Sequence, residues 1–130
     1  PCVDISTQGY SLWGGSAGAR MAVDLGSYGP AAFGGEQVPR PAAVVMGYTG
    51  HTRYTESDPP TFAVVSLDDP IASPRVMERR ITALNAAGVD TEFHLYRNAG
   101  HGFGLGTGTD AEGWIDYAVH FWEQHLTKKK

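Results

Sequence analysis

The chain has 130 residues, of which 42% are hydrophobic and 18% are charged, and these values predict one globular domain over residues 1–130. A formal net charge of −4 argues against nucleic acids and anionic membranes as partners. Cys2 is the only cysteine, which excludes an internal disulfide and leaves the redox compartment open. We find no signal peptide and no apolar run of membrane-spanning length, so a cytoplasmic location is slightly favoured and the compartment stays unknown. The lysines at 128–130 are expected to form a disordered tail.

The first half of the chain predicts three strands and one helix. Residues 8–13 form the first predicted strand, and residues 17–25 form a short helix with Met21 and Leu25 on one side. Residues 26–41 are rich in glycine, proline and serine, which predicts a loop. The continuous apolar runs at 42–48 and 61–67 predict two strands that are buried on both faces.

The second half predicts a helix, a strand and a final helix. Ser73 is the expected N-cap of the first helix, with Pro74 at its first position and Gly88 as its C-cap. The apolar stripe of that helix consists of Met77, Ile81, Leu84 and Gly88. Residues 91–96 alternate in polarity like a strand at a sheet edge, residues 98–109 form a glycine-rich loop, and residues 110–126 form a long amphipathic helix.

Strands that alternate with helices in this way predict an α/β fold. We expect a mostly parallel sheet of about four strands, with flanking helices and right-handed crossovers. In such sheets the chemistry gathers at the carboxyl ends of the strands. Residues that directly follow a predicted strand are therefore the first candidates for a site.

One such stretch, Gly14-Gly15-Ser16-Ala17-Gly18, fits the pattern G-x-S-x-G between the first strand and the first helix. A serine nucleophile needs a tight turn of this kind, because the turn lifts its hydroxyl away from the backbone. The small residues around it leave room for the strand and the helix to pass closely. The alternative is a glycine- and serine-rich loop, since the pattern also arises by chance in a chain with 17 glycines.

Asp68, Asp69 and His101 also follow predicted strands, so they should reach the same edge of the sheet as Ser16. A serine hydroxyl becomes nucleophilic when a histidine takes its proton and a carboxylate orients that histidine. The order serine, aspartate, histidine along the chain fits this arrangement. The alternatives are a loop histidine flanked by glycines, and a pair of aspartates of which one only shapes the turn after its strand.

Three segments resemble the C-terminal half of an α/β-hydrolase of the esterase/lipase type, close to acetyl-esterase and xylan-esterase-like members. They are Tyr10 to Gly18, Asp68-Asp69-Pro70-Ile71 and Asn98 to Phe103. The resemblance implies Ser16 as nucleophile, His101 as base and Asp69, two residues before an aliphatic one, as the acid in preference to Asp68. It also implies the backbone N–H of Ala17 in the oxyanion hole, and Gly14, Gly15 and Gly18 as the small residues of the elbow.

The sequence departs from this family at its front. Such hydrolases usually have about four strands before the elbow, and a loop among them supplies a second oxyanion donor. We therefore expect that this chain can contain the triad without being a competent enzyme by itself. The elbow strand should also expose an unpaired edge, which favours self-association or pairing with the missing N-terminal half. A monodisperse monomer of the chain alone, seen by light scattering, would contradict this.

The predicted function is that of a serine hydrolase that cleaves short-chain acyl esters of the acetyl type, on a small-molecule or carbohydrate-linked substrate. The alternatives are a serine peptidase, a thioesterase or a catalytically silent fragment. We expect no cofactor and no metal, because the chain has no cysteine cluster and no G-x-G-x-x-G run. His120 and His125 have the wrong spacing for a zinc pair and are predicted to lie at the surface or the rim.

Overall fold

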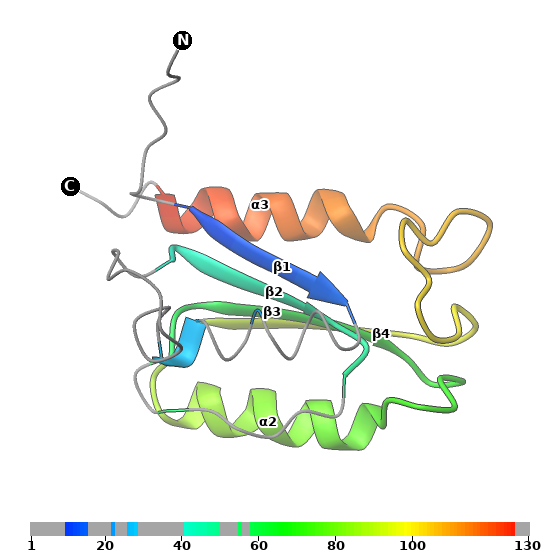
Figure 1. The fold of residues 1–130 in the computed structure, drawn as a ribbon, viewed down its shortest axis with the longest axis horizontal. Coiled ribbons are helices and arrows are strands. Elements are labelled where there is room, and N and C mark those ends of the chain that lie inside the picture. Colours follow the sequence, from blue (N-terminus) through cyan, green and yellow to red (C-terminus); the bar gives the residue numbers. More distant parts are fainter. Residues whose placement is uncertain are drawn as a thin grey trace, which may run out of the picture.

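The computed structural model describes residues 10–15, 22, 26–28, 41–49, 55 and 58–126. Within them, four parallel strands form a sheet whose spatial order equals their order along the chain (Figure 1). The strands are β1 (Ser11–Gly15), β2 (Ala43–Gly47), β3 (Thr61–Ser66) and β4 (Thr91–Tyr96). The parallel α/β architecture predicted from the alternation of strands and helices is therefore confirmed.

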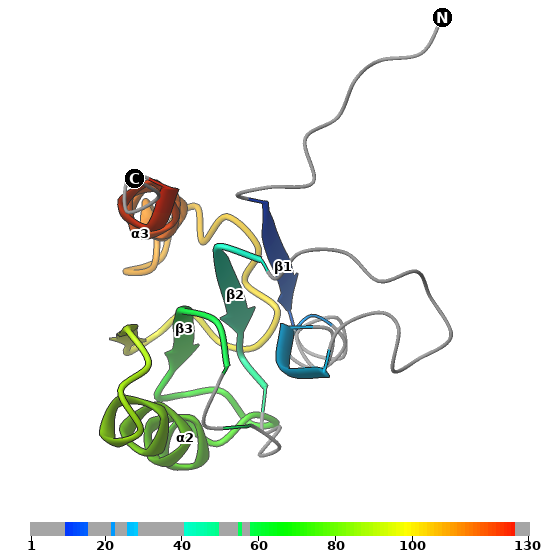
Figure 2. The same ribbon diagram turned by 90° about the vertical axis from the view of Figure 1, so that its left-hand side faces the viewer.

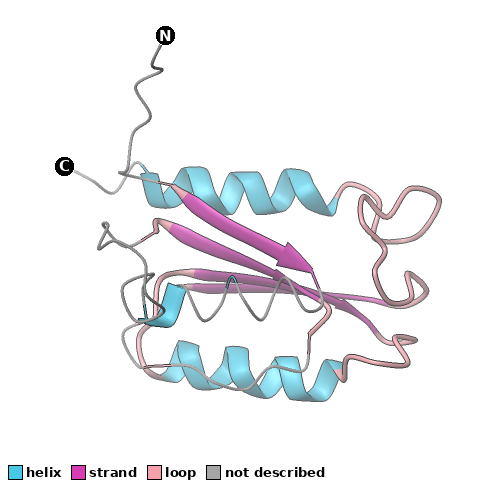
Figure 3. Cartoon of the chain, in the orientation of Figure 1, coloured by secondary structure: helices cyan, strands magenta, loops and turns pink. Residues whose placement is uncertain are grey.

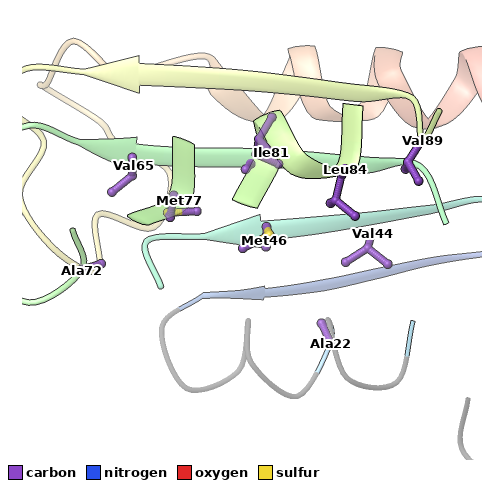
Figure 4. Packing of buried hydrophobic residues seen from close by; sticks show 10 residues of the cluster. Ala22, Val44, Met46, Val65, Ala72, Met77, Ile81, Leu84 and Val89 are labelled. Atoms are coloured by element: carbon purple, nitrogen blue, oxygen red, sulfur yellow. The ribbon is translucent and has the colours of Figure 1, made fainter. Parts of the chain in front are cut away.

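Two helices, α2 (Pro74–Ala86) and α3 (Trp114–Leu126), cover opposite faces of the sheet (Figure 2). On one face, Met77 and Leu84 of α2 pack with Met46 and Val65 of the strands (Figure 4). On the other face, side chains of α3 pack against the alternate residues of β2 and β3; this cluster includes Val45, Phe62, Val64, Trp114, Ala118 and Phe121. Every residue of β2 and β3 is buried because both of their faces are covered, as their apolar runs predict.

The outer strands are more exposed than the inner ones. β4 lies at one edge of the sheet and is half-buried along most of its length, which confirms the alternation predicted for residues 91–96. β1 lies at the other edge, and the Trp13 side chain is 39% exposed there. Its pairing with β2 extends to Gly15 opposite Gly47, two residues beyond the predicted strand end. Pairing of the outer edge of β1 with another segment or chain stays a prediction.

The ends of α2 follow from local sequence. Ser73 is the N-cap, and its Oγ accepts a hydrogen bond from the N–H of Val76 at 3.3 Å. The C-cap is Ala87, one residue before the predicted Gly88. Gly88 follows with a φ of +93°. The N–H of the next residue, Val89, donates a hydrogen bond to the carbonyl of Leu84. This is the Schellman arrangement, and glycine adopts its left-handed backbone without strain.

Two predicted boundaries are wrong. The last helix begins at Trp114 and not at residue 110, because the carboxylate of Asp110 instead accepts the N–H groups of Arg97 and Asn98 and closes the preceding loop. Residues 26–28 are helical, although Gly26 was predicted to begin a loop. A Cβ at Gly26 would lie 2.6 Å from Cγ2 of Val44, so this glycine permits close packing and does not end the helix.

His125 was predicted to lie at the surface or the rim, and the structure shows its contacts. Its side chain is only 8% exposed and lies in the last turn of α3, where Nδ1 is 2.8 Å from the carbonyl oxygen of Phe121. Nε2 is 3.1 Å from a carboxylate oxygen of Asp90, the residue before β4. The end of α3 packs over the start of β4, and this partly buried histidine lines an open cavity there, in agreement with the predicted rim position.

Candidate active site

The carboxyl ends of the strands meet at one edge of the sheet. β1 ends at Gly15, directly before Ser16, and the loops that follow β3 and β4 leave the sheet at the same end (Figure 3). Asp68 and Asp69 lie in the turn after β3, and His101 lies in the loop after β4. The fold therefore places the turn with both aspartates beside the loop with the histidine, as parallel strands require.

Asp69 contacts His101 directly. Oδ2 of Asp69 lies 2.8 Å from Nδ1 of the imidazole, which confirms the predicted contact and favours Asp69 over Asp68 as the partner. The Asp69 side chain is fully buried, whereas that of His101 is 17% exposed. Because a carboxylate only accepts hydrogen bonds, Nδ1 must hold the proton of the neutral ring. The lone pair of the imidazole is then on Nε2, the nitrogen that a general base uses.

The other oxygen of Asp69 shapes its own turn. Oδ1 accepts the N–H groups of Ile71 and Ala72, both at 2.7 Å. One carboxylate thus both closes the turn after β3 and orients the histidine. Since two backbone donors hold Oδ1, the carboxylate cannot rotate away from the imidazole without losing them.

Asp68 points its carboxylate at the histidine loop instead. Oδ1 accepts the hydroxyl of Ser66 at 2.6 Å and the N–H of Gly100 at 2.8 Å. These bonds, first from Ser66 and then from Gly100, hold the pKa of Asp68 below its ordinary 3.8. The sequence analysis missed Ser66, although a serine that ends an apolar strand two residues before an aspartate is a readable signal.

Tyr48 is a second residue that the sequence analysis missed. It follows β2, and its ring lies edge-on to His101 with centroids 5.2 Å apart, and 4.7 Å from the centroid of Phe103. Its φ of +33° is unusual for a residue with a side chain, and such strain gathers at functional sites. A Cβ at Gly15 would lie 2.6 Å from the phenol oxygen, so Gly15 must be a glycine for this ring to fit.

An open cavity of about 340 Å³ lies between the elbow strand and the histidine loop. Its wall includes the backbone of Gly14 and Gly15, the ring of Tyr48, and Leu105 from the loop. Trp13, Trp114 and Ile115 also line it, so its surface is mainly apolar. This concave space borders Gly15, the residue before Ser16.

Ser16, Ala17 and Gly18 lie outside the described residues, so their roles stay predictions. The structure shows the geometry of Asp69 and His101, and their catalytic roles stay predictions as well. In the described part of the chain, no group of three histidine, cysteine, aspartate or glutamate side chains is arranged to hold a metal ion. No helix among these residues is long and apolar enough to span a membrane.

Solved structures of hydrolases have a similar fold. The chain is similar to a sugar hydrolase from Lactococcus lactis, at 21% identity over 97% of this chain and 62% of that one, with a TM-score of 0.76. It is similar to an α/β-hydrolase enzyme from a Medee basin deep-sea metagenome library, at 24% identity over 90% and 54% of the two chains, with a TM-score of 0.72. A carboxylesterase from Lactobacillus plantarum has 18% identity over 94% and 60%, with a TM-score of 0.73. The chain thus spans 54% to 62% of the length of these three structures.

The fold is therefore that of the α/β-hydrolases, as the three sequence segments indicate. No curated protein matches the chain. The model of the prolyl oligopeptidase family matches residues 36–129, a range that includes Asp69 and His101 and begins after Ser16. Because this match covers most of the chain, the protein belongs to the prolyl oligopeptidase family of α/β-hydrolases.

Proposed function

We propose that this chain contributes the triad of a serine hydrolase that cleaves short-chain acyl esters, with Ser16 as nucleophile, His101 as base and Asp69 as the orienting acid. The observation that supports it best is the hydrogen bond of 2.8 Å between Asp69 and Nδ1 of His101, at the sheet edge where β1 ends, one residue before Ser16. The open cavity beside Gly15 is of a size that suits a small acyl group.

In the proposed reaction, Nε2 of His101 takes the proton of the Ser16 hydroxyl while Oγ attacks the ester carbonyl carbon. The backbone N–H of Ala17 donates to the oxyanion that forms. The imidazolium then gives its proton to the leaving alcohol oxygen, the carbon–oxygen bond breaks, and the acyl group stays on Ser16. Water releases it by the same two proton transfers, and the buried carboxylate of Asp69 stabilises the imidazolium in both halves.

A serine peptidase is the second candidate, because the matching family is that of a peptidase. The triad chemistry is the same for an amide, and the difference lies in the walls that hold the substrate. A thioesterase on the same fold has no observation of its own in its favour.

The test uses the full-length protein that contains this chain. A fluorophosphonate probe should label Ser16, and 4-nitrophenyl acetate should be hydrolysed faster than a peptide 4-nitroanilide. Ser16→Ala should abolish the labelling and lower kcat for the ester about a millionfold, as removal of the nucleophile does in other triads. Ser11→Ala is the matched control, since Ser11 begins β1, the strand that ends one residue before Ser16, and its hydroxyl oxygen accepts a hydrogen bond from the indole N–H of Trp13.

Labelling of a different serine in the folded protein would show that Ser16 is not the nucleophile. Faster cleavage of the anilide than of the ester would replace the esterase with the peptidase. A folded protein that binds neither the probe nor the substrates would refute the proposal as a whole.

A further inference from the structure

We propose that Asp68 is a positioning residue for His101, which it holds through Ser66 and the backbone of residues 99–100. This inference rests on the proposed function, because it concerns a residue that holds His101, the proposed base of the triad. It differs from the role of Asp69, because Asp68 bonds to Ser66 and Gly100 and so acts on the loop that presents the imidazole.

Besides the contact of Asp69 with His101, two hydrogen bonds join the end of β3 and its turn to the loop after β4, and a third links Ser66 to Asp68. The N–H of Gly100 donates to Oδ1 of Asp68 at 2.8 Å, and the hydroxyl of Ser66 donates to the same oxygen at 2.6 Å. The oxygen of Ser66 accepts the N–H of Ala99 at 3.0 Å. Two successive backbone groups directly before His101 are therefore held by one carboxylate and by the serine that the carboxylate orients.

Among the described residues, no atom packs closely beside the Cα of the two glycines next to His101, so hydrogen bonds contribute to fixing their backbone. Gly100 and Gly102 flank His101 with φ values of +73° and +69°, in the left-handed region that favours glycine. A Cβ added at either glycine would meet nothing within 4 Å. Glycines without neighbours allow many backbone conformations, so the hydrogen bonds to Gly100 and Ala99 select the one that aims the imidazole at its site.

The two aspartates divide the task between them. Asp68 holds the backbone before His101, and Asp69 holds its ring. Both belong to one turn, which the N–H of Asp69 closes onto the carbonyl of Ser66 at 3.2 Å. Hydrogen bonds to residues 66–69, at the end of the buried strand β3, therefore fix the position of His101. A residue that only shaped its own turn would not reach Gly100, which lies 32 positions further along the chain.

The test compares Asp68→Ala with Asp110→Ala in the full-length protein. Asp110 is the matched control: it also accepts two backbone N–H groups of this loop, from Arg97 and Asn98, but at the base of the loop and away from His101. We expect Asp68→Ala to lower kcat for 4-nitrophenyl acetate about ten- to a hundredfold, because small displacements of a base are costly, while KM changes less than about twofold. Asp68→Asn should retain most of the activity, since its amide oxygen can still accept both bonds.

A second readout needs no substrate. The proton between Nδ1 of His101 and Asp69 should give a far-downfield NMR signal, which its absence in His101→Gln would assign. In Asp68→Ala this signal should broaden through faster exchange with water, and in Asp110→Ala it should match the wild type. Since the signal is read without turnover, it decides the inference even if the protein hydrolyses no ester. An unchanged signal in Asp68→Ala, or equal loss of kcat in both alanine variants, would overturn the inference.

Discussion

Among the described residues, two aspartates with buried carboxylates, Asp58 and Asp69, each pair with a basic side chain and are built alike. Oδ1 of Asp58 accepts hydrogen bonds from the N–H and the hydroxyl of Thr55, and Oδ2 lies 3.5 Å from Nη2 of Arg80. In Asp69, Oδ1 accepts two backbone N–H groups, and Oδ2 lies 2.8 Å from Nδ1 of His101. Each carboxylate thus uses one oxygen to fix a turn and the other to hold its partner.

The basic partners differ in place and in chemistry. Arg80 belongs to α2, and its side chain is 1% exposed, with Nη1 3.7 Å from the sulfur of Met46 in the sheet. The side chain of His101 is 17% exposed and lies at the ends of the strands. A guanidinium stays protonated throughout the pH range of proteins, but an imidazole exchanges its proton near neutral pH. A buried pair with an arginine can therefore only hold the structure, while a pair whose histidine reaches an open edge can move protons.

For these two pairs, the largest effect is expected for Asp69→Asn, which should lower kcat about ten-thousandfold. The amide nitrogen would donate to Nδ1 of His101, so the ring proton would move to Nε2 and the base would be lost. The amide oxygen can still accept from Ile71 and Ala72, so the melting temperature of the full-length protein should change little. Steady-state kinetics and thermal unfolding measure both quantities, with Asp68→Asn as the matched control. Equal loss of kcat in the two variants would contradict the separate roles of the aspartates.

Arg80→Met should act in the opposite way, on stability and not on catalysis. It leaves the charge of Asp58 buried without its partner, so the free energy of unfolding should fall by about 3–5 kcal/mol. Urea unfolding of the full-length protein measures this, and kcat per folded molecule should stay near the wild-type value. Arg79→Met is the control, because Arg79 is exposed on the same helix. If the two variants unfold alike, Arg80 has no special structural role.

The smallest effect is expected for Thr55→Val, which removes the hydroxyl bond to Asp58 and keeps the backbone bond. The free energy of unfolding should fall by about 1 kcal/mol, the usual net contribution of one hydrogen bond. No side-chain substitution can remove a single hydrogen bond to Oδ1 of Asp69 in this way, because both of its donors, from Ile71 and Ala72, are backbone N–H groups. Thr91→Val is the control, because its hydroxyl accepts from Asn85 at an exposed position. An equal loss of stability in the control would refute the assigned contribution.

The sequence patterns predict most of the fold correctly. The apolar runs mark β2 and β3, and the cap residues Ser73 and Gly88 locate α2 to within one residue. The less accurate boundaries are those where a polar or small residue has a tertiary partner. Asp110 closes a loop instead of beginning a helix, and Gly26 packs closely against Val44 instead of breaking one.

The candidate site shows the same division. That Asp68, Asp69 and His101 reach one edge of the sheet follows from the sequence, because the direction of parallel strands brings residues after each strand together. The family resemblance indicated that Asp69 holds the imidazole, whereas the bond from Gly100 to Asp68 depends on how one turn faces another loop. Tyr48 gains its ring contacts only through this packing, so no local pattern marks it.

The order and type of the elements, the burial of the central strands and the edge at which the candidate residues gather all follow from the sequence alone. These features depend on local periodicity, caps and chain direction, which are written in neighbouring residues. The bonds of Asp58 to Arg80 and of Asp68 to Gly100 required the packed fold, since these partners are 22 and 32 positions apart along the chain. Whether such a pair serves stability or proton transfer depends on how deeply the packed helices and loops bury its basic member, and that is set by the fold as a whole.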